Sequence, residues 1–235
     1  MGLLLWMSHP CWPSFVWQTY DYYLEPTSAY FGCKKGSEPL HIQWNSLSDT
    51  VEVVNYSAGD VSGLTAEIEI LNIDGRSMMK KDATLTSAED SLVTVFKIAY
   101  PPGLSPVHFM RLTLSQNGSA RSTNVYLRPL HEGDYRAIRT LRPARVLAET
   151  DYEQHGQQWL LTSTLRNTSA WPALHVRLKA VRERSGDRIL PAIYDDNYIT
   201  LLPGESRIIR TELANVDTRG EKPRLVVGGF NVVEG

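Results

Sequence analysis

The chain has 235 residues, of which 42% are hydrophobic and 21% are charged, and its formal net charge is −2. These values are typical of globular domains with apolar cores. They exclude the strong positive charge that favours binding to nucleic acid or to an anionic membrane.

The start of the chain does not have the pattern of a targeting segment. Residues 2–7 are apolar, but they are far fewer than the roughly 20 residues that span a bilayer. No basic residue precedes them, and no small-residue cleavage site follows them, as a signal peptide would require. We therefore interpret this start as the interior of a longer protein.

Residues 1–37 are rich in aromatic side chains and predict one β/α unit. Residues 3–5 form an apolar run without alternation, which is typical of a strand buried in a parallel sheet. Ser14 is a suitable N-cap for a following helix, and Pro26 would end that helix or bend it into a second short one that closes near Gly36. The residues at helical spacing in the first helix are Val16, Trp17, Tyr20 and Leu24.

From residue 38 to residue 130 the pattern changes to the alternation of β-strands. About seven short strands in roughly 90 residues are the signature of an immunoglobulin-like sandwich. The clearest strands are at 41–44, 50–55, 66–71, 92–98, 109–114 and 123–127, with turns at 72–75 and 116–119.

Residues 131–235 repeat this pattern after a polar connector at 131–144. Arginines recur at every third position there, and we favour a solvated or domain-bridging face over an anion site: Arg136, Arg139, Arg142 and Arg145. Strands are expected at 159–165, 173–181, 189–193, 198–201, 207–213 and 224–233. The predicted fold class is therefore mainly β. Two tandem immunoglobulin-like β-sandwiches, over 38–130 and 131–235, are preceded by a short strand–helix remnant.

Neither a metal nor a cofactor is expected. The two cysteines, Cys11 and Cys33, could pair, but two buried thiols are favoured, and His9 and His41 nearby complete no zinc pattern. The densest polar cluster, residues 195–197, could offer oxygen ligands to calcium, although a plain Asx turn is the favoured interpretation. The sequence contains no nucleophile elbow, phosphate-binding loop or zinc-protease motif.

Trp6 and Trp12 carry the one functional prediction made from residue chemistry. Trp6 follows the apolar run, and Trp12 follows a short loop. In a β/α barrel the substrate meets the carboxyl ends of the strands, where an indole offers a flat apolar face to a sugar ring and an N–H donor. On composition alone, packing of both indoles in a core is the favoured alternative.

A set of short motifs carries a family resemblance. The first are W-x5-W-P-S from Trp6 to Ser14, Y-D-Y at 20–22 and A-Y-F-G at 29–32. Later ones are V-E-V-V-N at 51–55, L-P-A-I-Y-D-D-N-Y at 190–198 and L-P-G-E at 202–205. Together they resemble the C-terminal part of glycoside hydrolase family 2, in its branch of exo-β-D-glucosaminidases, mannosylglycoprotein endo-β-mannosidases and β-mannosidases.

The resemblance implies a five-domain parent, with residues 1–37 as the last β/α unit of its catalytic (β/α)8 TIM barrel and two immunoglobulin-like domains after it. The family is retaining and uses two glutamates about 5–5.5 Å apart, an acid/base and a nucleophile. Both lie on earlier barrel strands, so the resemblance implies no catalytic residue in this chain and no activity of the chain alone. Trp6, His9 and Trp12 would bind substrate in the complete enzyme, and His9 stands where close relatives often have asparagine.

The implied partners are the remainder of the chain's own catalytic barrel and an oligosaccharide or glycan substrate, with neither nucleic acid nor a membrane among them. The implied location is secreted or periplasmic. The unpartnered barrel unit would expose an apolar face. It would then fold against the first sandwich, be disordered, or pair with another copy.

A second class of function stays open on the sequence, namely a non-enzymatic carbohydrate-binding or adhesion module of tandem immunoglobulin-like domains. Such sandwiches host unrelated functions. Its candidate binding residues are Trp44, Trp159 and Trp171, although each is equally suited to a core.

Overall fold

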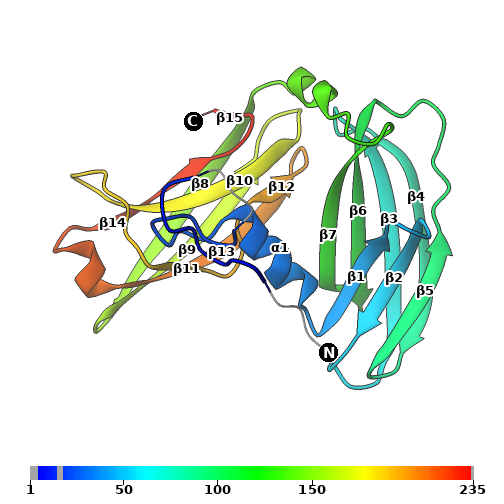
Figure 1. Cartoon of the computed structure of the whole chain (residues 1–235), viewed down its shortest axis with the longest axis horizontal. Helices are drawn as coiled ribbons and strands as arrows, with labels where there is room; N and C mark the ends of the chain where they lie inside the picture. Colours follow the sequence, from blue (N-terminus) through cyan, green and yellow to red (C-terminus); the bar gives the residue numbers. More distant parts are fainter. Residues whose placement is uncertain (1–4, 15–17, 234–235) are drawn as a thin grey trace. The chain divides into compact units, whose positions relative to one another are not determined.

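The computed structural model describes residues 5–14 and 18–233 (Figure 1). They belong to two compact units, one of Lys34–Leu141 and one that combines Met1–Cys33 with Arg142–Gly235. Within the described residues, α1 (Ser28–Gly36) is the one α-helix, and no helix is long and apolar enough to cross a membrane. The predicted domain boundaries at 37/38 and 130/131 stay predictions.

The unit of Lys34–Leu141 is a sandwich of two antiparallel sheets, with strand orders β1-β2-β5 and β4-β3-β6-β7. Each predicted strand in this region is confirmed, and β4 was not among them. Three consecutive charged residues, 80–82, conceal its alternation. The strands are β1 (Leu40–Asn45), β2 (Thr50–Asn55), β3 (Val61–Asn72), β4 (Ser77–Ser87), β5 (Ser91–Lys97), β6 (Val107–Gln116) and β7 (Ser119–Pro129).

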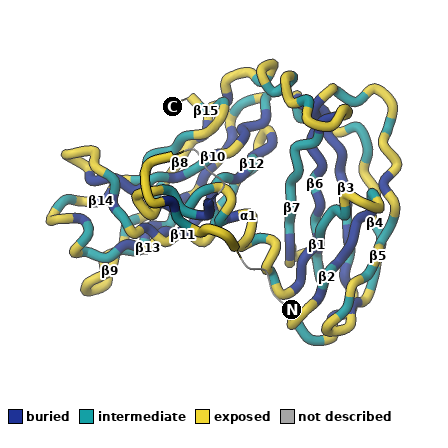
Figure 2. Tube along the Cα trace, viewed as in Figure 1, coloured by how far each residue is buried: buried dark blue, intermediate teal, exposed yellow. Residues whose placement is uncertain are grey.

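The core of this first sandwich lies between the facing sheets, where Figure 2 shows the buried stretches of β1, β2, β3 and β6. In β3 the alternate residues Ala66, Ile68 and Ile70 are fully buried, as the period of two requires. The cluster also contains Leu40, Ile42, Val51, Val53, Val61, Leu64, Ile98, Met110, Leu112 and Leu114, all within Lys34–Leu141.

The other unit is built on a second sandwich, with strand orders β11-β13-β9-β8-β15 and β12-β10-β14. Strand β15 pairs with β8 in parallel, and the other pairings are antiparallel. Strand β8 was not predicted, because most of its side chains are polar and exposed. The strands are β8 (Ala144–His155), β9 (Gln158–Asn167), β10 (Ala173–Arg182), β11 (Ala192–Tyr194), β12 (Ile199–Leu201), β13 (Ser206–Ala214), β14 (Pro223–Gly228) and β15 (Val232–Val233), and the 3-10 helices are η1 (Arg136–Thr140) and η2 (Asn215–Thr218).

The core of the second sandwich includes a residue from the N-terminal segment. Phe31 on α1 is 6% exposed and packs in the cluster that holds Leu161, Leu165 and Leu178. Its ring centroid lies 6.0 Å from that of Tyr198. The described part of the N-terminal segment thus packs on the second sandwich, which was not among the three outcomes expected for it.

The predicted helix after Ser14 was wrong over residues 18–27, and residues 15–17 lie outside the described structure. The Asp21 carboxylate accepts the backbone N–H of Tyr23 at 2.8 Å and of Glu25 at 2.9 Å, and Leu24 has a φ of 66°. Aspartate competes in this way with helical hydrogen bonding and produces a turn. The second short helix, which closes near Gly36, is confirmed as α1.

Two further expectations concern the same segment. The apolar run at residues 3–5 lies outside the described residues except for Leu5, which is in no strand, so the barrel remnant stays a prediction. The prediction of two buried thiols was wrong, since Cys11 and Cys33 are both exposed and form no disulfide.

Candidate functional site

The residues predicted to bind substrate lie on one irregular segment, residues 5–14. Trp6 is 84% exposed and Trp12 is 67% exposed, so neither indole is packed in a core of the described structure. His9 is half-buried, and its Nε2 lies 3.3 Å from the carbonyl oxygen of Tyr22. Both indoles are thus available to a ligand or to a further part of the protein.

A second irregular stretch, residues 18–27, holds this segment in place. The backbone N–H of Tyr20 donates to the carbonyl of Ser8 at 2.9 Å, and the Thr19 hydroxyl donates to the same oxygen at 3.1 Å. The stretch is closed on itself by Thr27, whose hydroxyl donates to the carbonyl of Gln18 at 2.9 Å. We call residues 18–27 the anchor loop.

The anchor loop is tied to the second sandwich by one arginine. Nη1 of Arg188 lies 2.6 Å from Oε2 of Glu25 and 3.2 Å from Oδ2 of Asp21, and the guanidinium lies 4.5 Å from the ring centroid of Tyr23. Sequence reasoning missed these residues, because the stretch before Pro26 was predicted to be a helix. Glu25 is 8% exposed and requires a cation, but its cation lies 163 positions away, so no local sequence signal indicates the pair.

The two N-terminal stretches carry a band of exposed apolar side chains. This name describes their place on the two stretches and their exposure. Trp6 and Trp12 are its most exposed members, and the band also contains Leu5, Met7, Tyr22, Tyr23 and Leu24.

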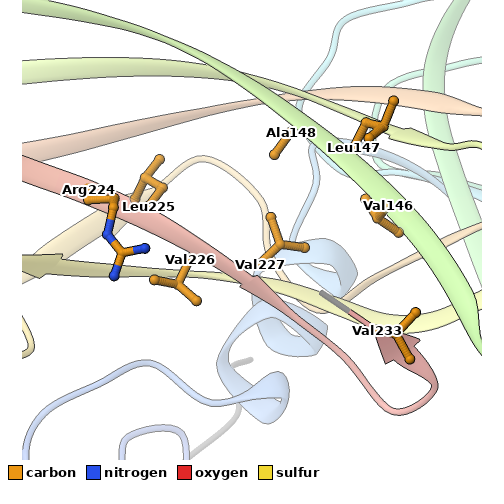
Figure 3. A pocket seen from close by; sticks show the side chains of 8 residues that line it. All are labelled: Val146, Leu147, Ala148, Arg224, Leu225, Val226, Val227 and Val233. Carbon is orange, nitrogen blue, oxygen red and sulfur yellow. The ribbon is translucent and has the colours of Figure 1, made fainter. Parts of the chain in front are cut away.

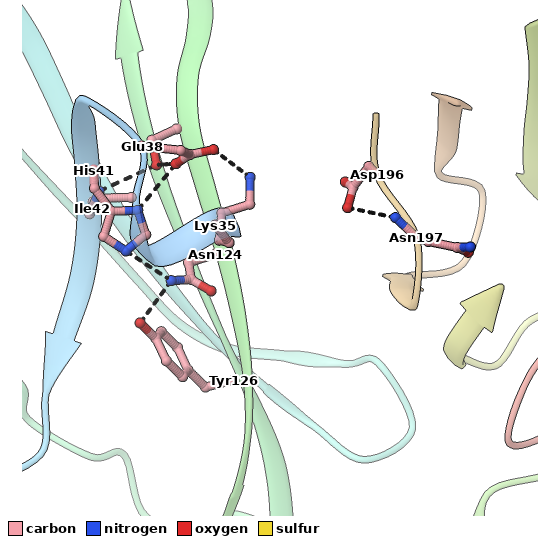
Figure 4. Close-up of polar contacts among 9 residues, drawn as sticks. Lys35, Glu38, His41, Ile42, Asn124, Tyr126, Asp196 and Asn197 are labelled. Atoms are coloured by element: carbon pink, nitrogen blue, oxygen red, sulfur yellow. Dashed lines mark hydrogen bonds and ion pairs between the residues drawn. The ribbon is translucent and has the colours of Figure 1, made fainter. Parts of the chain in front are cut away.

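Glu38 is the centre of a polar network in the first sandwich (Figure 4). Its carboxylate accepts hydrogen bonds from Lys35 at 2.7 Å, from Nδ1 of His41 at 3.1 Å and from the Ser122 hydroxyl at 2.6 Å. Burial alone would raise the pKa of Glu38, but these three donors outweigh it and lower the pKa to about 2. A carboxylate held ionised in this way is suited to structure and not to proton donation.

The side chains of the polar cluster at residues 195–197 bond backbone groups of the second sandwich (Figure 4), and the Asx turn stays a prediction. Asp196 accepts the N–H of Asn197 at 2.9 Å, and Asn197 bonds both the N–H and the carbonyl of Leu178 on β10. Among the residues that the structure describes, no group of three or more His, Cys, Asp or Glu side chains could hold a metal ion.

The three tryptophans of the adhesion alternative have partners within their own units. Nε1 of Trp44 donates to Asp49 at 2.9 Å, with the Arg128 guanidinium 3.8 Å above its ring. Trp159 donates to Asn215 at 3.0 Å and packs on the core of the second sandwich. Trp171 lies 5.1 Å from the guanidinium of Arg142, and all three indoles are only partly exposed.

A groove of about 340 Å³ lies between β8 and β14 of the second sandwich (Figure 3). Its walls are Val146, Leu147 and Ala148 on one side and residues 224–227 on the other, and Arg224 is its one charged residue. Catalytic sites need convergent polar groups. This groove therefore offers no acid/base chemistry.

Comparison with known proteins relates nearly the whole chain to one group of enzymes. Residues 124–232 match the exo-β-D-glucosaminidase Ig-fold domain. The exo-β-D-glucosaminidase of Streptomyces avermitilis is 32% identical over 99% of this chain, which covers 28% of that protein. The mannosylglycoprotein endo-β-mannosidase of Lilium longiflorum is 24% identical over 99% of this chain and is covered to 31%.

A solved structure extends this likeness to three dimensions. The exo-chitosanase CsxA of Amycolatopsis orientalis, in complex with PNP-β-D-glucosamine, has a TM-score of 0.90 at 29% identity. The alignment covers 98% of this chain and 30% of that one. The chain thus spans less than a third of the length of these relatives, and over nearly its whole length it is similar to the C-terminal part of exo-β-D-glucosaminidases, in keeping with the resemblance to glycoside hydrolase family 2.

Proposed function

We propose that the full-length protein is a retaining glycoside hydrolase that acts on β-linked glucosamine or mannose residues. This chain would be its non-catalytic C-terminal region, which supports the barrel and supplies the last wall of the sugar site. The observation that carries the proposal is the exposure of Trp6 and Trp12 on a segment that hydrogen bonds hold in place.

The side chains of this segment suit a sugar. An exposed indole presents a flat apolar face to the C–H side of a pyranose ring and an N–H to its hydroxyls. His9 adds a polar group between the two indoles in sequence. Since the carbonyl of Tyr22 can only accept, Nε2 of His9 donates to it, which leaves Nδ1 for a hydrogen bond with a sugar hydroxyl.

The acidic pair on the anchor loop does not suit catalysis. Glycoside hydrolysis with retention needs one carboxylic acid that can donate a proton and one free carboxylate nucleophile. Asp21 and Glu25 both accept from the guanidinium of Arg188, which keeps a permanent positive charge. We therefore assign the acid/base and the nucleophile to the part of the protein outside this chain.

The exposed apolar band has a natural partner in the same proposal. The remainder of the catalytic barrel would cover Leu5, Met7 and Leu24, while a glycan chain meets the indoles. On the resemblance alone, we also propose a secreted or periplasmic location. The adhesion alternative has less support, because Trp44, Trp159 and Trp171 have internal partners.

Hydrolysis of a panel of aryl β-glycosides, including the β-glucosaminide and the β-mannoside, tests the proposal. We expect turnover by the full-length protein and none by residues 1–235 alone. Turnover by the isolated chain would contradict the assignment of the carboxylates. Inactivity of both, together with glycan binding by the isolated chain, would favour the adhesion module.

A further inference from the structure

The anchor loop is the link between the second sandwich and the sugar-binding segment. We propose that Arg188, which lies outside the predicted barrel unit, is a positioning residue for Trp6, His9 and Trp12. The inference rests on the proposed sugar-binding role of those three residues and adds a residue of the second sandwich to the determinants of substrate affinity.

The backbone of Arg188 is firmly placed in the second sandwich. It follows a turn closed by the bond from the N–H of Arg182 to the carbonyl of Asp187, at 2.8 Å. It precedes Ile189, which is fully buried and donates to the carbonyl of Ala180 at 2.9 Å. Arg188 itself forms a bridge with Val181 on β10. Its side chain therefore projects from a rigid base.

The guanidinium reaches three residues of the anchor loop at once. It bonds Glu25 at 2.6 Å and Asp21 at 3.2 Å, and it lies over the ring of Tyr23. The Glu25 side chain is only 11% exposed. Removal of the cation would leave a buried, unpaired carboxylate, which is costly enough to displace the loop.

The loop transmits this placement to the sugar-binding segment through short steps. Asp21, which bonds Arg188 with Oδ2, orders the turn with Oδ1 by accepting from Tyr23 and Glu25. The flanking residues of that turn then contact the segment. Tyr20 donates to the carbonyl of Ser8, and the carbonyl of Tyr22 accepts from His9. Ser8 and His9 lie between Trp6 and Trp12, so a displaced loop moves the residues that separate the indoles.

The test uses the full-length enzyme and the aryl β-glycoside that it hydrolyses best. Arg188→Met keeps most of the side-chain length and removes the charge. Because the reacting carboxylates are elsewhere, we expect KM to rise about tenfold, equivalent to about 1.4 kcal/mol, with kcat changed by less than about twofold. Arg188→Lys should recover part of the affinity, since an ammonium can neutralise Glu25 but its shorter side chain lacks the planar guanidinium that lies over the ring of Tyr23.

Arg184→Met is the matched control, because Arg184 lies on the same turn with a side chain that is 79% exposed. Hydrogen exchange in the same proteins gives a readout of loop order. The amides of Tyr23 and Glu25 should exchange faster in Arg188→Met and at the wild-type rate in Arg184→Met. A merely structural role would lower the melting temperature while leaving KM and these two amides unchanged, and that result would overturn the inference.

Trp6→Ala and Trp12→Ala distinguish failure of the inference from failure of the proposed function. If both leave KM unchanged, the sugar-binding role of the segment is wrong. If they raise KM and Arg188→Met does not, the role stands and Arg188 is not a positioning residue. If Arg188→Met does not fold, Arg188→Lys decides, with a smaller rise in KM expected and an unchanged KM contradicting the inference.

Discussion

In each of the two sandwiches, a buried asparagine at the end of a strand bonds the opposite sheet, and we call it the corner asparagine. In the first, β2 ends at Asn55, which is fully buried. Its amide donates to the carbonyls of Gly59 at 2.8 Å and Ser87 at 3.4 Å, and its oxygen accepts from Ala58 at 3.0 Å. Because Ser87 ends β4 in the opposite sheet, this side chain joins the two layers.

In the second sandwich, β9 ends at Asn167, which is also fully buried. Its amide donates to the carbonyls of Trp171 at 2.8 Å and Leu201 at 2.9 Å, and its oxygen accepts from Ser169 at 3.0 Å. Leu201 ends β12 in the opposite sheet. An equal arrangement of bonds thus recurs 112 positions later, between Asn55 and Asn167.

The sandwiches differ in the origin of their cores. Among the residues that the structure describes, the core cluster of the first comes from Lys34–Leu141, whereas that of the second also includes Phe31 from α1. The first is therefore complete as a continuous stretch of chain. The second depends on a segment that precedes the first in sequence, which makes it the part that connects to the proposed barrel.

Loss of either corner asparagine should have the largest effect on stability. We expect Asn55→Ala or Asn167→Ala to lower the free energy of unfolding of its own sandwich by about 4 kcal/mol, because one buried and two partly buried backbone groups lose their partners. The isosteric Asn167→Asp should cost nearly as much, since a carboxylate oxygen would face two carbonyl oxygens. Denaturant unfolding, followed separately in each unit by hydrogen exchange, measures this.

The sandwich that keeps its asparagine is the internal control for each variant. If Asn55→Ala lowers the stability of both units equally, the sandwiches are not independent. If neither corner substitution costs more than about 1 kcal/mol, the value of an ordinary net hydrogen bond, the amide bonds do not staple the sheets.

Truncation of Phe31 should have the next largest effect, confined to the second sandwich. Phe31→Ala removes a buried ring from its core, and we expect a loss of about 3 kcal/mol there, with the first sandwich unaffected. Phe230→Ala is the control, because that ring belongs to the same unit and is 58% exposed. Equal losses for the two variants would show that the N-terminal segment contributes nothing to the second core.

The sequence predicts the sandwiches well where the strands alternate. The alternation of Ala66, Ile68 and Ile70 with polar residues predicts a strand with one buried face, and all three side chains are buried. Strand β8 could not be predicted in this way, because few of its side chains are buried and its position depends on pairing with β9. The periodicity of apolar residues along the sequence does not indicate such long-range pairing.

The candidate site was likewise predicted only in part. Motif spacing singled out Trp6, His9 and Trp12, but the anchor loop could not be predicted, since Tyr20 and Leu24 at helical spacing favoured a helix. A single carboxylate, Asp21, decides the outcome by bonding Tyr23 and Glu25. Its cation, Arg188, lies 167 positions away, which no local pattern reports.

The smallest expected effect concerns Glu38 of the first sandwich and its dependence on pH. The pKa of Glu38 is lowered in the folded chain to about 2, from an ordinary value of 4.5. The unfolded state therefore binds the proton first, so stability from the contacts of Glu38 with Lys35, His41 and Ser122 is present above pH 4.5 and is lost as the pH falls towards 2. After allowance for solvent screening of a side chain that is 27% exposed, this amounts to about 2 kcal/mol.

Glu38→Gln, which cannot titrate, should reduce the loss of stability between pH 5 and pH 2.5 by a large part of that amount, measured as the denaturant midpoint of the first sandwich. The same pH dependence in wild type and variant would mean that other carboxylates cause it.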